Sequence, residues 1–73
     1  MKVGDLIKVI NGQTFPVDGV VSAGTGLSNE SMLTGEEKFV QKNVGSNVFG
    51  GTTLNRGSLI VRVTKLQEYA TFN

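Results

Sequence analysis

The chain has 73 residues, which leaves room for one small domain built around a single core. Hydrophobic residues make up 38% of the sequence and charged residues 18%, which is typical of a folded globular domain and excludes a disordered one. Seven basic residues are scattered from Lys2 to Lys65, and six acidic residues bring the net charge to +1. Because the basic residues form no dense stripe along the sequence, nucleic-acid binding is disfavoured.

Cysteine and histidine are both absent from the sequence. Disulfides, thiolate and imidazole metal ligands, and nucleophilic catalysis through either residue are therefore excluded. The longest apolar run is Leu59 to Val61, whereas a membrane-spanning helix needs roughly 20 apolar residues. We expect neither a signal peptide nor a membrane anchor in this chain, and no metal or cofactor site.

Ten glycines, a single proline and clusters of β-branched residues predict a mainly β fold of short strands joined by tight turns. The first strand is expected over residues 5–10, with Leu6 and Ile10 on one face beside Lys8. Asn11-Gly12 then matches a two-residue hairpin signal.

Residues 15–17 are expected at a sheet edge or a strand start, because Pro16 has no N–H to donate. A turn is expected at Asp18-Gly19, and a new strand at Val20. The small, polar residues 22–28 favour a loop or an irregular sheet edge.

The middle of the chain predicts a series of short elements. We expect at most one helical turn after Ser28, a strand over residues 38–41 and a turn around Gly45. A strand over residues 48–54 would contain a bulge at its paired glycines, and a turn would follow at residues 55–57.

Residues 58–65 are the clearest strand, with alternating apolar residues that should face the core. The residues expected in the core are Val48, Phe49, Leu59, Val61 and Val63. The tail, from about residue 66 to 73, has no periodic pattern of apolar residues and no turn signal. We expect it to be a poorly defined end of a domain cut from a longer protein.

The segment from Asn29 to Glu37 places Gly35 between a hydroxyl and a carboxylate, Thr34 and Glu36. Such a loop can project Glu36 outward. From the residues alone, a charged and solvated surface turn is the simplest interpretation.

Five sequence blocks give this loop a context. In order they are Val3–Ile7, Pro16–Gly19, Glu30–Glu36, Gly50–Thr52 and Asn55–Ser58. In this order and spacing they resemble the actuator domain of P-type cation-transporting ATPases, over nearly the whole chain. The heavy-metal branch, and copper-transporting pumps within it, are the most similar.

The resemblance implies one actuator domain over residues 1–73, folded as a small distorted jelly-roll or double-stranded β-helix-like sandwich. It also implies a place on the cytosolic face of a membrane, as part of an ATP-hydrolysing integral membrane protein. The partners would be the phosphorylation domain, the nucleotide-binding domain and the transmembrane helices of the same chain. ATP and Mg would bind in the full-length pump, and the fragment itself would be monomeric and inactive.

The resemblance also implies catalytic roles for Thr34, Gly35 and Glu36. In this family the loop docks at an aspartyl phosphate, where Glu36 would orient and partly deprotonate the attacking water. Gly35 would let the backbone approach closely, and the Thr34 hydroxyl would contact a phosphate oxygen or hold the loop. Glu30 and Ser31 would support the loop.

Three positions depart from the family pattern. The family usually has Asp at Asn29, Ser or Ala at Glu37, and Pro at Phe39. Asn29 keeps an acceptor oxygen without the charge, and Phe39 adds apolar area where a fixed φ is usual.

Two other interpretations remain open at this stage. One is a small β-barrel module that binds a protein or ligand through its polar loops, with no catalytic role. The other is a free-standing acid hydrolase that uses Glu30 and Glu36 as paired carboxylates, which would need a cleft to separate their pKa values.

Overall fold

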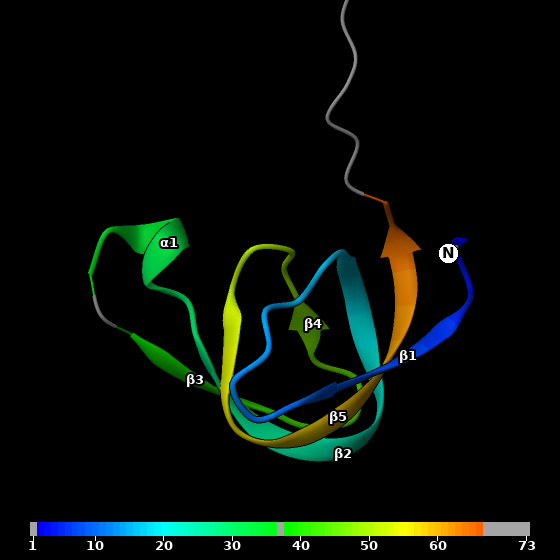
Figure 1. Cartoon of the computed structure of the whole chain (residues 1–73), viewed down its shortest axis with the longest axis horizontal. Coiled ribbons are helices and arrows are strands. Elements are labelled where there is room, and N and C mark those ends of the chain that lie inside the picture. The colour runs from blue at the N-terminus through cyan, green and yellow to red at the C-terminus, as the bar shows by residue number, and fades with distance from the viewer. Residues whose placement is uncertain (1, 37, 67–73) are drawn as a thin grey trace, which may run out of the picture.

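The structure is a computed structural model that describes residues 2–36 and 38–66. These residues form five strands and a helix of one turn, and every strand pair is antiparallel (Figure 1). The elements are β1 Leu6–Ile10, β2 Asp18–Asn29, α1 Ser31–Thr34, β3 Phe39–Lys42, β4 Asn47–Val48 and β5 Thr53–Lys65. The expected mainly β fold is confirmed, although β2 and β5 have 12 and 13 residues and are not short.

The strands form one sheet in the order β1-β5-β2-β3, and β4 pairs with the beginning of β2. The two long strands, β2 and β5, lie side by side along most of their length, with three shifts of register. Irregularities of this kind bend a strand and increase its twist. The sheet therefore curls, and β3 and β4 reach opposite ends of β2 (Figure 1).

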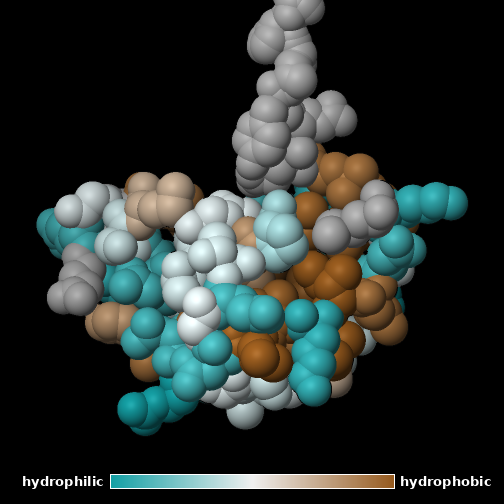
Figure 2. All heavy atoms as spheres, in the orientation of Figure 1, coloured by the Kyte–Doolittle hydropathy of each residue, from teal (hydrophilic) through white to brown (hydrophobic). Residues whose placement is uncertain are grey.

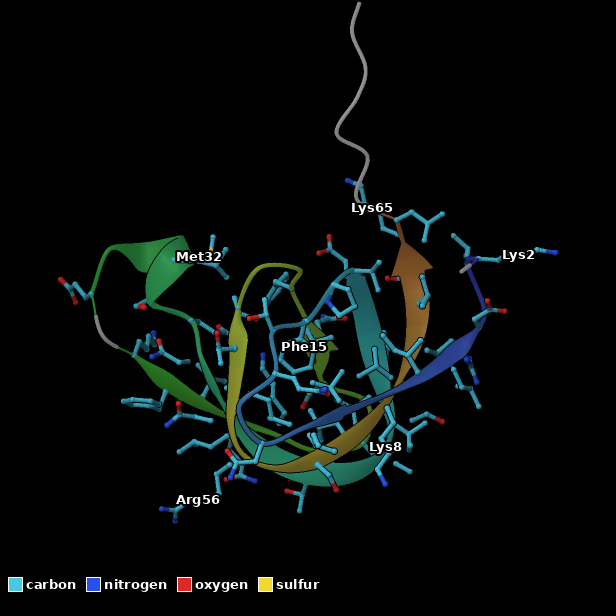
Figure 3. The ribbon with its side chains drawn as sticks, viewed as in Figure 1. Lys2, Lys8, Phe15, Met32, Arg56 and Lys65 are labelled. Atoms are coloured by element: carbon cyan, nitrogen blue, oxygen red, sulfur yellow. The ribbon has the colours of Figure 1, made fainter. Side chains whose placement is uncertain are left out.

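The hydrophobic core lies inside this curl, with Phe15 near its centre (Figure 3). The alternation expected in residues 58–65 is confirmed, because Leu59, Val61 and Val63 are at most 1% exposed. The connected core cluster comprises Val9, Phe15, Val21, Val48, Leu54, Leu59 and Val61. Figure 2 shows hydrophobic residues gathered over the curled sheet, with mostly polar residues around them.

Two details of the expected core differ in the structure. The prediction that Phe49 belongs to the core is wrong, since 37% of its surface is exposed. In β1 the inward residues are Ile7 and Val9, while Leu6 and Ile10 lie on the exposed outer face. The alternation of the strand is thus regular, with its core face on the odd-numbered residues.

Three glycine-rich stretches are strand where the sequence predicts turns or loops. Asp18-Gly19 lies in β2 and residues 55–57 lie in β5, so these two turn predictions are wrong. Residues 22–28 also lie in β2, where the pairing with β5 shifts register, so the loop is wrong but the irregularity is present. Gly24 and Gly57 have φ of +92° and +90°, and a Cβ on either would overlap a backbone carbonyl oxygen of the facing strand. These glycines allow two bulged strands to approach closely instead of reversing the chain.

The remaining predictions are confirmed in part. A turn forms at Asn11-Gly12, where the Gln13 N–H donates to the Ile10 carbonyl at 3.0 Å, but no hairpin follows because β1 pairs with β5. The strand expected over residues 48–54 is wrong, since a turn at residues 49–52 separates β4 from β5. The single helical turn, the strand near residues 38–41 and the turn around Gly45 are confirmed. Of the expected tail, residues 67–73 lie outside the described residues.

Candidate functional site

The candidate loop connects β2 to β3 and projects from one end of the sheet with α1 (Figure 1). Its base is closed by strand pairing, because Asn29 at the end of β2 lies opposite Phe39 at the start of β3. One residue further in, the Glu30 N–H donates to the Lys38 carbonyl at 2.9 Å. The loop therefore leaves the sheet from a fixed position.

Local hydrogen bonds explain why a helix of only one turn forms here. The Asn29 side-chain oxygen accepts a bond from the Ser31 N–H at 3.0 Å, so Asn29 supplies the acceptor that an Asp would supply. The Leu33 N–H donates to the Glu30 carbonyl at 3.0 Å, and the Gly35 N–H donates to the Ser31 carbonyl at 2.8 Å. These bonds satisfy backbone groups at both ends of α1.

Gly35 ends the helix and redirects the chain. Its φ of +79° and ψ of −1° are left-handed, the conformation in which glycine commonly terminates a helix. A Cβ at this position would have nothing within 4 Å, so the requirement for glycine in the isolated domain is conformational and not steric. Beyond this turn, Glu36 is exposed, as the sequence predicts. The backbone of Thr34 forms the last residue of α1.

Glu30 has a different position from Glu36, because its side chain is buried. Its Oε2 lies 2.7 Å from Nζ of Lys42, and the two side chains are 11% and 6% exposed. This is an ion pair at the foot of the loop. The acid hydrolase interpretation fails here, since Glu30 is held in a buried pair while Glu36 lies exposed beyond α1.

Lys42 connects the loop to a second segment. Its ammonium also donates to the Asn47 carbonyl at 2.7 Å and lies 5.3 Å from the centre of the Phe49 ring. Sequence reasoning missed Lys42, because a lone lysine in a short strand is normally exposed. Phe49 therefore lies beside this ammonium and outside the connected core cluster.

The turn at residues 49–52 is itself held by one bond to a distant residue and by one bond within the turn. The Asp18 carboxylate accepts a bond from the Gly50 N–H at 2.7 Å, and the Thr52 hydroxyl donates to the Phe49 carbonyl at 2.7 Å. From α1, Met32 points toward this turn (Figure 3), and a Cβ on Gly51 would come within 3.2 Å of the Met32 methyl carbon. Three of the five sequence blocks thus meet at one place.

The exposed Glu36 lies outside the hollow that borders β1. A hollow of about 450 Å³ lies beside β1, and no residue of the candidate loop lines it. Within residues 2–36 and 38–66, no group of three or more acidic, cysteine or histidine residues could hold a metal ion. In the same part of the chain, no helix is long and apolar enough to span a membrane.

Comparison with known proteins identifies the class. Residues 1–73 match the sequence profile of the P-type ATPase actuator domain, and the chain belongs to this family. The resemblance based on the five blocks is therefore confirmed, and the match favours an actuator over an unrelated binding module.

The similar proteins are heavy-metal pumps. The chain is 43% identical over 72 residues to a protein named zinc-transporting ATPase in Bacillus subtilis, covering 99% of this chain and 11% of that protein. It is 48% identical over 65 residues to the copper-exporting P-type ATPase B of Archaeoglobus fulgidus, covering 89% of this chain and 9% of that protein. The chain thus spans about a tenth of the length of these relatives.

A solved structure agrees with the fold. The chain superposes on the crystal structure of a zinc-transporting PIB-type ATPase in the E2.Pi state with a TM-score of 0.83 and 30% sequence identity. The match covers 90% of this chain and 11% of that chain. The curled sheet is therefore the actuator fold of the heavy-metal branch.

Proposed function

We propose that this domain is the actuator of a heavy-metal-transporting P-type ATPase, and that its Thr34-Gly35-Glu36 loop promotes hydrolysis of an aspartyl phosphate on another domain. The observation that carries the proposal is the position of Glu36, which is exposed just beyond a glycine turn whose base is anchored in the sheet. A carboxylate presented in this way can enter a site formed by a partner.

The reaction we propose is attack of water on phosphorus. The water oxygen forms a bond to phosphorus, the bond from phosphorus to the aspartate oxygen breaks, and Glu36 accepts the proton that the water loses. General-base help of this kind typically contributes about 10² to 10⁴ in rate. Because a carboxylate and a phosphate repel each other, Glu36 would act only when the partner site supplies compensating positive charge.

The proposed setting follows from the relatives. The domain would lie on the cytosolic face of a membrane, as one domain of a single chain with phosphorylation and nucleotide-binding domains and transmembrane helices. ATP and Mg would bind to those other domains. Residues 1–73 would form one actuator domain.

For the transported ion we propose copper. The support is the similarity to copper-transporting relatives, among them the copper-exporting protein of Archaeoglobus fulgidus at 48% identity over 65 residues, together with the Pro16–Gly19 block. Stimulation of ATP hydrolysis by Cu⁺ and not by Zn²⁺ in the full-length pump supports this assignment, and the reverse preference overturns it.

The experiment that tests the proposed reaction uses Glu36→Gln in the full-length pump. The amide keeps the size of the side chain but cannot accept the proton. We expect the phosphoenzyme to form from ATP and then to decay about 10² to 10⁴ times more slowly. Asp5→Asn is the matched control, since Asp5 is an exposed acid beside β1 and should leave decay unchanged. Normal decay in Glu36→Gln would contradict the proposal.

A further inference from the structure

Lys42 is a buried cation at the junction between the loop and the rest of the sheet. The whole residue is 5% exposed, although it is the last residue of a four-residue strand. A lysine is almost never this deeply buried unless its charge is paired. The ammonium of Lys42 must therefore have partners that compensate its charge.

The partners of the ammonium come from two separate segments. One is the Glu30 carboxylate at 2.7 Å, from the residue that precedes α1. The others are the Asn47 carbonyl at 2.7 Å and the Phe49 ring at 5.3 Å, from β4 and the turn that follows it. An ammonium over an aromatic face is attracted by the ring, and more strongly where water is excluded. Lys42 thus joins the loop to the β4 segment.

Each end of this connection is fixed by further bonds. On the loop side, the Glu30 N–H donates to the Lys38 carbonyl, and the Glu30 carbonyl accepts a bond from the Leu33 N–H. These bonds hold the backbone of Glu30, and Lys42 holds its side chain. On the other side, the turn that contains Phe49 is held by bonds from Thr52 and to Asp18. Lys42 thus adds a side-chain tie between the loop and the β4 segment to the backbone bonds that hold the start of α1.

We infer that Lys42 is a positioning residue for the dephosphorylation reaction, acting through Glu30 on the placement of Glu36. This inference rests on the proposed function. Misplacing a reacting group by about 1 Å can cost about 100-fold in rate, even when the change is far from the chemistry. Loss of the tie between Glu30 and Lys42 should therefore slow hydrolysis without removing any group that touches the phosphate.

The test compares four variants in the full-length pump. Lys42→Met removes the ammonium but keeps much of its length. Lys42→Arg keeps a cation that can pair with Glu30. The double variant Glu30→Gln with Lys42→Met removes both buried charges, so that no carboxylate is left unpaired. Lys8→Met is the matched control, because it removes an exposed lysine from β1.

We expect phosphoenzyme decay to slow about 10-fold to 100-fold in Lys42→Met, with its formation from ATP unchanged. Lys42→Arg should recover most of the decay rate, and Lys8→Met should keep the parent rate. The double variant should regain the melting temperature lost in Lys42→Met while its decay stays slow. That separation is the signature of positioning, since a purely structural role would restore stability and decay together.

Two outcomes would overturn the inference, and Glu36→Gln measured alongside distinguishes them. If Glu36→Gln slows decay and Lys42→Met does not, or if the double variant recovers both properties, Lys42 has no positioning role although the proposed function stands. If Glu36→Gln itself leaves decay unchanged, the proposed function fails and the inference fails with it.

Discussion

Gly35 and Gly45 both have a left-handed backbone conformation, although they lie in different turns. Their φ values are +79° and +94°, and a Cβ at either would have nothing within 4 Å. An alanine at either position thus meets strain but no collision. Gly35 lies between α1 and Glu36, whereas Gly45 lies in the turn between β3 and β4.

We therefore predict that Gly35→Ala and Gly45→Ala each lower the free energy of unfolding of the 73-residue chain by about 1–2 kcal/mol, the cost of a left-handed residue with a Cβ. Urea denaturation measures this. In the full-length pump only Gly35→Ala should slow phosphoenzyme decay, since only that turn directs Glu36. Equal decay rates in the two variants would show that the conformation at Gly35 has no part in the reaction.

The buried pair of Glu30 and Lys42 shows what the sequence could and could not predict at this scale. The loop from Thr34 to Glu36 was predicted through the resemblance of the blocks, and its catalytic role stays a prediction. Lys42 belongs to no block and its partners are set by the fold, so local sequence contains no sign of its burial. The acceptor at Asn29 was predicted correctly, because one oxygen serves as well as another for the Ser31 N–H.

At the scale of elements, the long strands β2 and β5 explain most of the wrong predictions. A glycine with positive φ has the same local signature in a turn and in a bulge. What distinguishes the two is the partner strand, and that pairing joins Gly26 in β2 to Gly57 in β5, far apart in the sequence. Elements with a plain apolar alternation, such as residues 58–65, were predicted correctly because burial of one face decides them locally.

Gly57→Ala should accordingly be far more damaging than Gly45→Ala. Both residues have positive φ, but a Cβ on Gly57 would overlap the Thr25 carbonyl oxygen and lie 2.9 Å from the Gly26 Cα. Crowding of a packed region adds about 1–3 kcal/mol to the backbone strain. Urea denaturation of both variants measures the difference. If Gly57→Ala were no less stable than Gly45→Ala, the close approach of β2 and β5 at this point would be wrong.

At the scale of the whole molecule, Glu36 is exposed beyond the glycine turn that ends α1. The hollow beside β1 contains none of the candidate residues, and the loop is anchored to a sheet with a well-defined core. The chain corresponds to about a tenth of the length of its relatives. On our account, the other reacting groups are supplied by other domains.

We predict that the purified 73-residue chain folds cooperatively and hydrolyses neither ATP nor an acyl phosphate above the background rate. Circular dichroism on heating tests the first part, and release of inorganic phosphate tests the second. Hydrolysis that is present in the parent chain and lost in Glu36→Gln would show that the chain contains a complete active site.

The most direct test of the central claim is oxygen exchange between inorganic phosphate and water in the full-length pump. Reversal of the proposed step joins phosphate to the aspartate and releases a water, so phosphate labelled with ¹⁸O loses its label in repeated cycles. We predict that Glu36→Gln slows this loss by about 10² to 10⁴, while ATP still phosphorylates the aspartate. Loss of label at the parent rate in Glu36→Gln would contradict the role of Glu36 in activating the water.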